Sequence, residues 1–391
     1  MCQSHLNCQR KPVVKRIYLD YNATTPMDDV VIEAIEQVSR SLKGNPSSVH
    51  SEGQRARAVI ERARRVIAGL VGSDKKEIVF TSGATESVNW VHQCLPHPGW
   101  IVTTRLEHPA VLQACHSAVD RGLAAGCLLL DNDEQGNIDL NQLRQELNSE
   151  RSVSLVSVML VNNEIGVRFP LEEIASLCRK AEVRCHTDAT QAVGRIPLSF
   201  KELDVDLASF SAHKMYGPMG VGGLYVHNRV ELEPFLSGGH QERAIRPGTE
   251  NLIGIVGFGA AAVLAGDLEE EHERQQQLLQ RLKQAVLQEI DKVVVNGESP
   301  SMAPNVLNVS FLGCDAEALS IACDLEGLSI SAGSACSVGS VETSHVIRAI
   351  TDDQERRRSA MRISLGRYTT EEEIDSCVAI LARCVERLRE S

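Results

Sequence analysis

The sequence lacks two features that would point to a membrane or to nucleic acid. None of its apolar runs approaches the roughly 20 residues that a helix needs to cross a bilayer. Positive charge is not concentrated either, because 40 Lys and Arg stand against 52 Asp and Glu, for a formal net charge of −12. A nucleic-acid groove needs clustered Lys and Arg to contact phosphates. We therefore expect neither a membrane protein nor a nucleic-acid-binding protein.

Closely spaced cysteine pairs are also missing. The 12 cysteines are scattered from Cys2 to Cys384 with no C-x-x-C pair, which excludes the usual zinc and thioredoxin spacings, and we expect no metal site. Because no apolar secretory segment precedes them, we expect a cytoplasmic protein in which most thiols are small core residues and one or two do chemistry. The basic residues 1–16 predict a flexible N-terminal arm, with a targeting peptide as the alternative. The role of Cys2 and Cys8 within it stays open.

The length of 391 residues suits two domains. Helical and strand patterns alternate over residues 28–230, which is typical of parallel strands joined by crossover helices. The apolar runs that predict strands there are 77–81, 101–104, 127–130, 155–160, 183–188, 207–211 and 222–226. We expect an α/β fold in which residues 17–260 form a large domain around a mostly parallel seven-stranded sheet, its first residues either there or packed on the second domain. Residues 261–391 predict that second, smaller α+β domain.

Two short motifs follow predicted strands. TSGATES (81–87) lies between a strand and a helix, where small residues leave backbone N–H groups free to bind an anion with help from the helix dipole. An ordinary strand–helix turn has the same composition. Asp188, at the carboxyl end of another predicted strand, is either a helix cap or a carboxylate paired with a pyridinium nitrogen. Each motif alone leaves two interpretations open.

Two reactive side chains have unusual neighbours. Lys214 in SFSAHKMYGP follows Ser211 and His213 at the end of a predicted strand. It is either a solvated surface lysine or an amine that binds an aldehyde cofactor covalently, with Ser211 and His213 holding a phosphate. Cys336 in GSAC has only small neighbours, so its thiol is either exposed and reactive or buried and inert.

Together and in this order, these motifs resemble the cysteine desulfurases, the NifS/IscS-like branch of the fold-type I pyridoxal-phosphate enzymes in the class-V aminotransferase family. The resemblance extends from about Ile17 to the end of the chain. Further matching stretches are LDYNATTP (19–26), GNPSS (44–48), EHPAV (107–111), VNNEIG (161–166), SAGSACS (331–337) and RISLGR (362–367). The resemblance implies a fold-type I architecture, a large domain plus a smaller C-terminal one, with pyridoxal 5′-phosphate as the cofactor.

The resemblance also implies a role for each matching residue. Lys214 would carry the cofactor and remove the substrate's α-proton, His108 would stack on the cofactor ring, and Cys336 would accept sulfur. Asp188 would bind the pyridinium nitrogen and Gln191 the phenolic oxygen. The groups that would hold the phosphate are Ala84, Thr85, Ser211, His213 and, from a partner chain, Thr249. The groups that would bind the substrate carboxylate are Arg362, Asn163, which would also contact the cofactor, and Asn45.

The implied reaction converts L-cysteine to L-alanine and leaves the sulfur on Cys336 as a persulfide. The persulfide would then be delivered to an acceptor protein, for iron–sulfur assembly or for thiolation. Because Thr249 would complete the site of a partner chain, the resemblance implies a homodimer with shared sites.

Three other functions stay open on the sequence alone. One is a simple aminotransferase, which would leave the Cys336 loop without a purpose. A selenocysteine lyase would have the same fold and cofactor, although the stretch after Cys336 resembles the long-loop desulfurases. A non-enzymatic regulator of this fold would be expected to add a basic DNA-binding module or to lose a catalytic group, and the sequence does neither. The departures from the family pattern that could alter the cleft rim or the dimer contact are Val88, Trp90, Met219 and His240.

Overall fold

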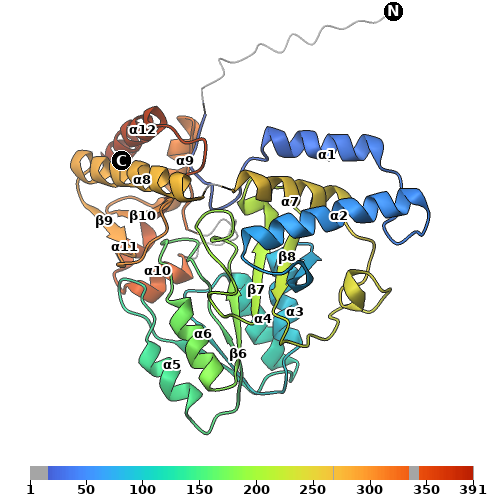
Figure 1. Ribbon diagram of the computed structural model, residues 1–391. Coiled ribbons are helices and arrows are strands. Elements are labelled where there is room, and N and C mark those ends of the chain that lie inside the picture. The colour runs from blue at the N-terminus through green and yellow to red at the C-terminus, as the bar shows by residue number, and fades with distance from the viewer. Residues whose placement is uncertain (1–15, 267, 334–342, 391) are drawn as a thin grey trace, which may run out of the picture.

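The computed structural model describes residues 16–266, 268–333 and 343–390, and its largest feature is a seven-stranded sheet (Figure 1). The strands are β2 (Ile78–Thr81), β3 (Trp100–Thr104), β4 (Gly126–Leu130), β5 (Val153–Ser157), β6 (Arg184–Asp188), β7 (Leu207–Ser211) and β8 (Gly222–Val226), in the order β2-β8-β7-β6-β5-β3-β4. The pairs among β4, β3, β5, β6 and β7 are parallel, whereas β8 runs antiparallel to both β2 and β7. The predicted α/β fold with a mostly parallel seven-stranded sheet is confirmed.

Both faces of this sheet are covered. Successive strand residues point to opposite faces, so Ile101 and Val102 of β3 belong to two different hydrophobic clusters, as do Leu155 and Val156 of β5. One face is covered by α3 (Ala84–Gln93) and α4 (Pro109–Asp120), and the other by α2 (Ser51–Leu70), α5 (Leu140–Leu147), α6 (Leu171–Lys180) and α7 (Leu252–Leu264). The central strands are buried on both sides, which explains why β5 is apolar or small throughout rather than alternating with charges.

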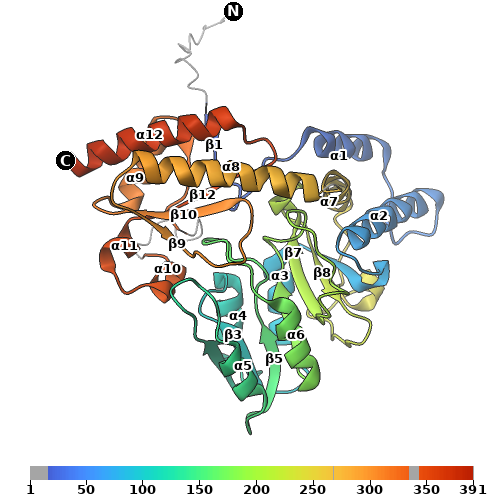
Figure 2. The ribbon, with the colours of Figure 1, turned by 60° about the vertical axis from the view of Figure 1, so that its left-hand side comes forward.

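A second core forms around a three-stranded antiparallel sheet, seen above the large sheet in Figure 2. Its strands are β9 (Val293–Asn296), β10 (Val306–Phe311) and β12 (Ala360–Ser364), and the helices of this region are α8 (Leu268–Glu289), α9 (Ala316–Leu325), α10 (His345–Ile350), α11 (Gln354–Arg358) and α12 (Glu371–Glu390). Apolar residues of α8, α9 and α12 pack against this sheet. Arg362 of β12 reaches the large domain, where it donates to the main-chain oxygen of Asn163.

The helical stretch after residue 251 is bent between the two cores. α7 and α8 meet at 76°; residues of α7 belong to the core of the large domain, and residues of α8 belong mainly to that of the small domain. Within residues 16–266, 268–333 and 343–390, no single helix is long and apolar enough to cross a membrane. Only α7 and α8 taken together reach the required length and apolar composition, and they are bent. The bend therefore carries the chain from one core to the other.

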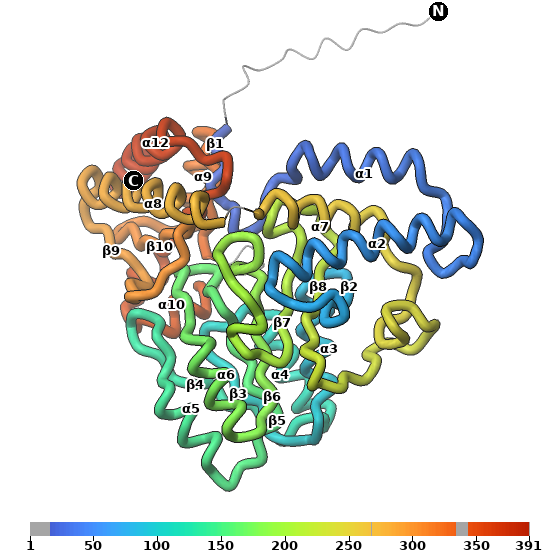
Figure 3. Tube along the Cα trace, viewed as in Figure 1, coloured from blue at the N-terminus to red at the C-terminus, as the bar shows by residue number. Residues whose placement is uncertain are grey.

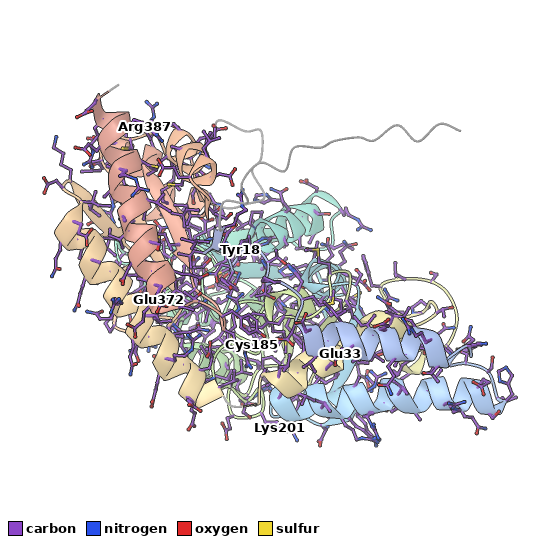
Figure 4. The ribbon with its side chains drawn as sticks, turned by 90° about the horizontal axis from the view of Figure 1, so that it is seen from above. Tyr18, Glu33, Cys185, Lys201, Glu372 and Arg387 are labelled. Carbon is purple, nitrogen blue, oxygen red and sulfur yellow. The ribbon has the colours of Figure 1, made fainter. Side chains whose placement is uncertain are left out.

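The segment between β1 and α1 also connects the two domains. β1 (Ile17–Tyr18) pairs in parallel with β11 (Leu328–Ser329), and Ile17 and Leu19 belong to the core of the small domain. The chain then crosses to α1 (Asp29–Ser41), which packs on α7 (Figure 3). Tyr18 accordingly lies between the small-domain helices and the large domain in Figure 4. Residues 20–25 thus run through the junction of the two domains.

Two buried histidines face each other between helix α3 and the large sheet. The rings of His92 on α3 and His186 on β6 are perpendicular, with their centroids 5.7 Å apart. His186 shares hydrogen bonds with Ser157 Oγ at 2.8 Å and Ser209 Oγ at 2.9 Å, both on neighbouring strands. Burial lowers the pKa of His92 to about 4, while the unfolded chain has a histidine pKa of about 6.5.

Acid should therefore destabilise the fold through His92. Between about pH 6.5 and pH 4 the unfolded chain binds a proton that the folded chain rejects, so stability falls as the pH falls through this window. We expect His92→Gln to reduce the loss of unfolding free energy between pH 7 and pH 5 by about 2 kcal/mol, measured by urea unfolding at both pH values. The matched control is His97→Gln, at an exposed position; an equal effect of both substitutions would contradict the assignment.

Candidate active site

A cavity of about 240 Å³ lies at the carboxyl ends of β5, β6 and β7, where the small domain meets the large sheet. Its lining residues are Asn22, Ala23, Ala84, Thr85, His108, Ala110, Met159, Val161, Asn163, Asp188, Thr190, Gln191, Ser211, His213, Lys214 and Arg362. Ligands of open α/β sheets bind outside the carboxyl ends of the strands. The cavity therefore has the position expected of a binding site.

Most of the residues predicted from the sequence meet in this cavity. They are Ala84, Thr85, His108, Asn163, Asp188, Gln191, Ser211, His213, Lys214 and Arg362. Asn45 and Thr249 are exposed and do not line it. The roles of Asn45 in substrate binding and of Thr249 in a partner's site stay predictions. Cys336, Cys2 and Cys8 lie outside the described residues.

One part of the cavity is built to receive an anion. The turn after β2 ends at Gly83, whose φ of 152° favours glycine, and α3 then begins at Ala84 with its N-terminus in the cavity. Ser211, at the end of β7, accepts a hydrogen bond from Ala84 N at 2.8 Å. The Thr85 and Ser211 hydroxyls thus lie beside the positive end of a helix dipole, which matches a phosphate group.

His213 completes this anion cradle in its uncharged form. Burial, together with the positive charges of Lys214 and Arg195, lowers the pKa of His213 to about 4. Its Nδ1 shares a hydrogen bond of 3.1 Å with Thr24 Oγ1, which orients the ring at the wall of the cavity. The cradle would therefore bind a phosphate through hydrogen-bonding groups, and His213 would add no positive charge to it.

Lys214 lies inside the cavity, so the alternative of a solvated surface lysine is wrong. Its Nζ donates hydrogen bonds to the main-chain oxygens of Asn22 at 2.6 Å and Ala23 at 2.7 Å. Gln191 Nε2 donates to the same Asn22 oxygen at 3.0 Å. Within the described residues, the buried Gln191 Oε1 and Asn163 Oδ1 have no hydrogen-bond partner. Buried polar atoms are nearly always paired, so these two atoms fit a cavity that binds a polar ligand.

Two further groups frame the amine. Asp188 at the end of β6 accepts a hydrogen bond from Thr190 N at 2.9 Å, so it acts as a local cap and lines the cavity as well. His108 caps α4 by accepting from Ala110 N at 3.1 Å through Nδ1. Burial lowers the pKa of His108, and the nearby Lys214 adds to this effect while Asp188 opposes it. His108 thus presents a fixed, uncharged ring to the cavity.

Arg362 reaches the cavity from β12 of the small domain with 2% of its surface exposed. Its Nη2 donates to Asp20 Oδ1 at 2.7 Å, and its Nη1 donates to the main-chain oxygen of Asn163 at 3.2 Å. Its Nε, which is also buried, has no partner within the described residues. A buried guanidinium with an unpaired N–H suits a carboxylate ligand.

The residues next to the segment that contains Cys336 are anchored beside this cavity. Gly333 approaches Ser344 so closely that a Cβ on Gly333 would lie 3.3 Å from the Ser344 Cβ. Ser344 Oγ donates to the buried Glu164 at 2.6 Å. His345 Nε2 shares a hydrogen bond of 2.8 Å with the main-chain oxygen of Glu107, the residue before His108. The C-terminal flank of the segment is thus held within one residue of the cavity wall, and Gly333 on the other flank lies next to it.

Residues 20–25 contribute more to the site than the sequence indicated. LDYNATTP (19–26) carries the family resemblance without predicting a site residue, yet Asp20 pairs with Arg362, and Asn22 contacts Lys214 and Gln191. Arg195, which no motif singled out, donates to the main-chain oxygen of Lys214. The contacts of Asp20 and Asn22 join residues more than a hundred positions apart, whereas Arg195 and Lys214 are 19 positions apart. Only the polar character of the stretch 20–25 hinted at the long-range contacts.

Two of the four departures from the family pattern do not lie at the rim of the cleft. Val88 and Trp90 are fully buried in the core between α3 and the sheet, and Trp90 Nε1 donates to the main-chain oxygen of Glu233 at 2.7 Å. They therefore fill the core beneath the turn between β2 and α3. Met219 and His240 are exposed, so an effect on the molecular surface stays a prediction for these two.

Comparison with known proteins agrees with this geometry. The family model described as aminotransferase class-V matches residues 17–377. A cysteine desulfurase of Mus musculus is 41% identical over 396 aligned residues, which cover 99% of this chain and 85% of that protein. The solved structure of a NifS-like protein superposes with a TM-score of 0.88 at 35% identity, covering 95% of this chain and 100% of that one. The structure of SspA in complex with cysteine has a TM-score of 0.78 at 30% identity, covering 90% and 99% respectively.

Proposed function

The chain belongs to the cysteine desulfurases of the class-V aminotransferase family, and on this premise we propose that it transfers the sulfur of L-cysteine to Cys336 and releases L-alanine. One observation carries the proposal. A single cavity contains an amine, an anion cradle and a buried guanidinium with an unpaired N–H. These three groups match an aldehyde, a phosphate and an amino-acid carboxylate.

The residues present fit pyridoxal 5′-phosphate. The N-terminus of α3, Thr85, Ser211 and His213 would hold its phosphate, and Asp188 would keep its ring nitrogen protonated. Gln191 would bind the phenolic oxygen through its amide, and His108 would cover one face of the ring. When bound, this cofactor supplies an electron sink that labilises the bonds at the substrate's α-carbon.

The substrate groups would be held by the chain itself. Arg362 and Asn163 would bind the carboxylate of cysteine, and Lys214 Nζ would take the α-proton and return a proton to the product. The Cys336 thiolate would attack the substrate sulfur, so that one S–S bond forms while the C–S bond of the substrate breaks. The products are alanine and a Cys336 persulfide, which an acceptor protein would then receive.

Arg362→Gln should weaken cysteine binding. A hydrogen bond to a charged group is worth about 1.5–3 kcal/mol, so KM for L-cysteine should rise roughly 10- to 100-fold. Arg362→Lys keeps the charge without the planar fork and should give a smaller rise. The control is Arg105→Gln, which removes an exposed ion pair with Asp131. Steady-state alanine formation measures KM, and an unchanged KM for Arg362→Gln would contradict the carboxylate assignment.

We also propose a homodimer with shared sites. The exposed apolar residues Val30 on α1, Ile253 and Val263 on α7, and Met219 lie on adjoining elements. Thr249, which would serve a partner's phosphate cradle, is exposed in the segment before α7. Sedimentation equilibrium should give twice the chain mass of 42.7 kDa, and a concentration-independent monomer would contradict a shared site.

A turnover assay tests the proposed reaction. The purified protein, reconstituted with pyridoxal 5′-phosphate and supplied with L-cysteine and dithiothreitol, should form alanine and sulfide in equal amounts. Formation of pyruvate instead of alanine would overturn the sulfur-transfer assignment. Turnover of selenocysteine but not cysteine would identify a selenocysteine lyase.

A further inference from the structure

Arg195 lies directly behind Lys214 without lining the cavity. Its Nε donates to the main-chain oxygen of Lys214 at 2.8 Å, and its Nη2 donates to the main-chain oxygen of Tyr21 at 2.7 Å. Its Nη1 donates to Asn22 Oδ1. One guanidinium therefore fixes the backbone of Lys214 and the segment on which the lysine amine rests.

The turn that follows β6 explains this placement. It supplies Asp188 and Gln191 to the cavity and then passes Gly194, whose φ of 73° and approach to Met215 exclude a larger residue. A Cβ on Gly194 would lie 2.8 Å from the Cβ of Met215, the residue after Lys214. This close approach brings Arg195 next to the main chain of Lys214.

Arg195 and Lys214 share one neutral neighbour. The guanidinium binds the side-chain oxygen of Asn22, and the lysine amine binds the main-chain oxygen of the same residue. In the part of the chain that the structure describes, no carboxylate lies within ion-pair distance of Arg195. The guanidinium and the lysine amine thus lie on the same neutral residue, and in that part of the chain the guanidinium is not paired with a carboxylate.

Other charged and titratable groups surround this pair. Those that act on Arg195 are Tyr216, Tyr18 and Arg362, and burial lowers the pKa of Arg195 to about 10, so it stays protonated at neutral pH. Those that line the same cavity as Lys214 are His213, His108 and Asp188. Asp188 is the acid among them, and its expected partner is the cofactor ring nitrogen.

We propose that Arg195 is a positioning residue for Lys214, which fixes the lysine against Asn22 and favours the uncharged form of its nitrogen. This inference rests on the proposed function, in which that nitrogen must be uncharged to take the α-proton. A nearby cation disfavours protonation of an amine. Arg195 would thus act on proton transfer through Lys214 without touching the substrate.

The pH dependence of the visible spectrum tests this proposal without relying on turnover. The absorbance of the cofactor bound to Lys214 reports whether the lysine nitrogen carries a proton. In Arg195→Gln, which keeps a hydrogen-bonding group and loses the charge, the midpoint of the spectral titration should rise by about one pH unit. Arg195→Lys restores the charge and should return the midpoint to within a few tenths of the wild-type value. The kcat–pH profile of Arg195→Gln should move in the same direction, with kcat at neutral pH about tenfold lower.

A matched control separates charge from general damage. Arg184→Gln removes another partly buried arginine of the same region, one that donates to the main-chain oxygens of Cys94 and Glu231 away from the cavity. It should leave the midpoint unchanged. Asn22→Asp is a second test, because a carboxylate beside both cations should favour the protonated nitrogen and raise the midpoint.

The outcomes are distinct. If Arg195 has only a structural role, Arg195→Gln and Arg195→Lys should both lower the melting temperature and the cofactor affinity, and the spectral midpoint should not move. That result would overturn the proposal. If Arg195→Gln does not fold, an unmoved midpoint in Asn22→Asp overturns it equally. If the wild-type holoenzyme makes no alanine from cysteine, the proposed function fails, yet the midpoints still decide the role of Arg195.

Discussion

Lys214→Ala is expected to abolish cysteine turnover, with a loss of more than about 10⁴-fold in kcat. Positioned general bases contribute roughly 10²- to 10⁴-fold, and Lys214 would also provide the covalent attachment of the cofactor. The amine is positioned for both tasks, because it lies in the cavity with its Nζ bound to the main-chain oxygens of Asn22 and Ala23.

The same substitution should leave the anion cradle intact. Ala84, Ser211 and His213 do not depend on the lysine side chain for their contacts, so the variant should still bind the cofactor noncovalently. Its spectrum should resemble that of the free aldehyde. After borohydride treatment, denaturation and filtration should release all of the cofactor from the variant, whereas the wild type should retain it. Alanine formation and this release assay provide the measurement.

The control is Lys201→Ala. Lys201 is an exposed lysine at the edge of the molecule that pairs with Asp74 at 3.0 Å (Figure 4). It should behave as wild type. Turnover by Lys214→Ala at more than a few per cent of the wild-type rate would show that another group carries the cofactor and takes the proton.

Cys336→Ala is expected to lower alanine formation from cysteine by at least about 10²-fold while leaving cofactor binding unchanged. Removing a covalent nucleophile leaves only the catalysis provided by the surrounding groups. The residues that flank the segment containing Cys336 lie beside the cavity: Gly333 approaches Ser344, and His345 contacts the main-chain oxygen of Glu107, the residue before His108. A thiol in this segment is therefore within chain reach of the substrate.

The matched control is another cysteine. Cys94 is partly buried, and burial raises the pKa of its thiol, which disfavours the reactive thiolate. Cys94→Ala should retain full activity. If Cys336→Ala still cleaves selenocysteine at the wild-type rate but not cysteine, the thiol is required for sulfur only. Unchanged cysteine turnover would instead remove Cys336 from the reaction.

The large sheet was predictable because its signals are local. Each strand is a short apolar run, and β6 and β7 end at Asp188 and Ser211, so parallel pairing alone places these two side chains at one edge. The turn before α3 was likewise visible as a run of small residues. Most of the cavity wall therefore follows from strand ends and motifs that lie within a few residues of each other.

The rest of the site depends on contacts that no local pattern encodes. β1 and β11 are two residues each and pair across more than three hundred positions, so neither has a periodicity that predicts the pairing. Arg195 contacts Asn22 only because the chain after β6 folds back at Gly194. No local pattern places Asn45 either, since its motif lies in the exposed loop between α1 and α2, and its role in substrate binding stays a prediction.

The most direct test of the account follows the sulfur in a single turnover. The holoenzyme is mixed with less than one equivalent of L-cysteine without reductant, trapped with an alkylating agent, digested and analysed by mass spectrometry. The account predicts one alanine for each cysteine consumed, and one added sulfur atom on the peptide that contains Cys336. Sulfur found free in solution, or on a different cysteine, with Cys336 unmodified would contradict it.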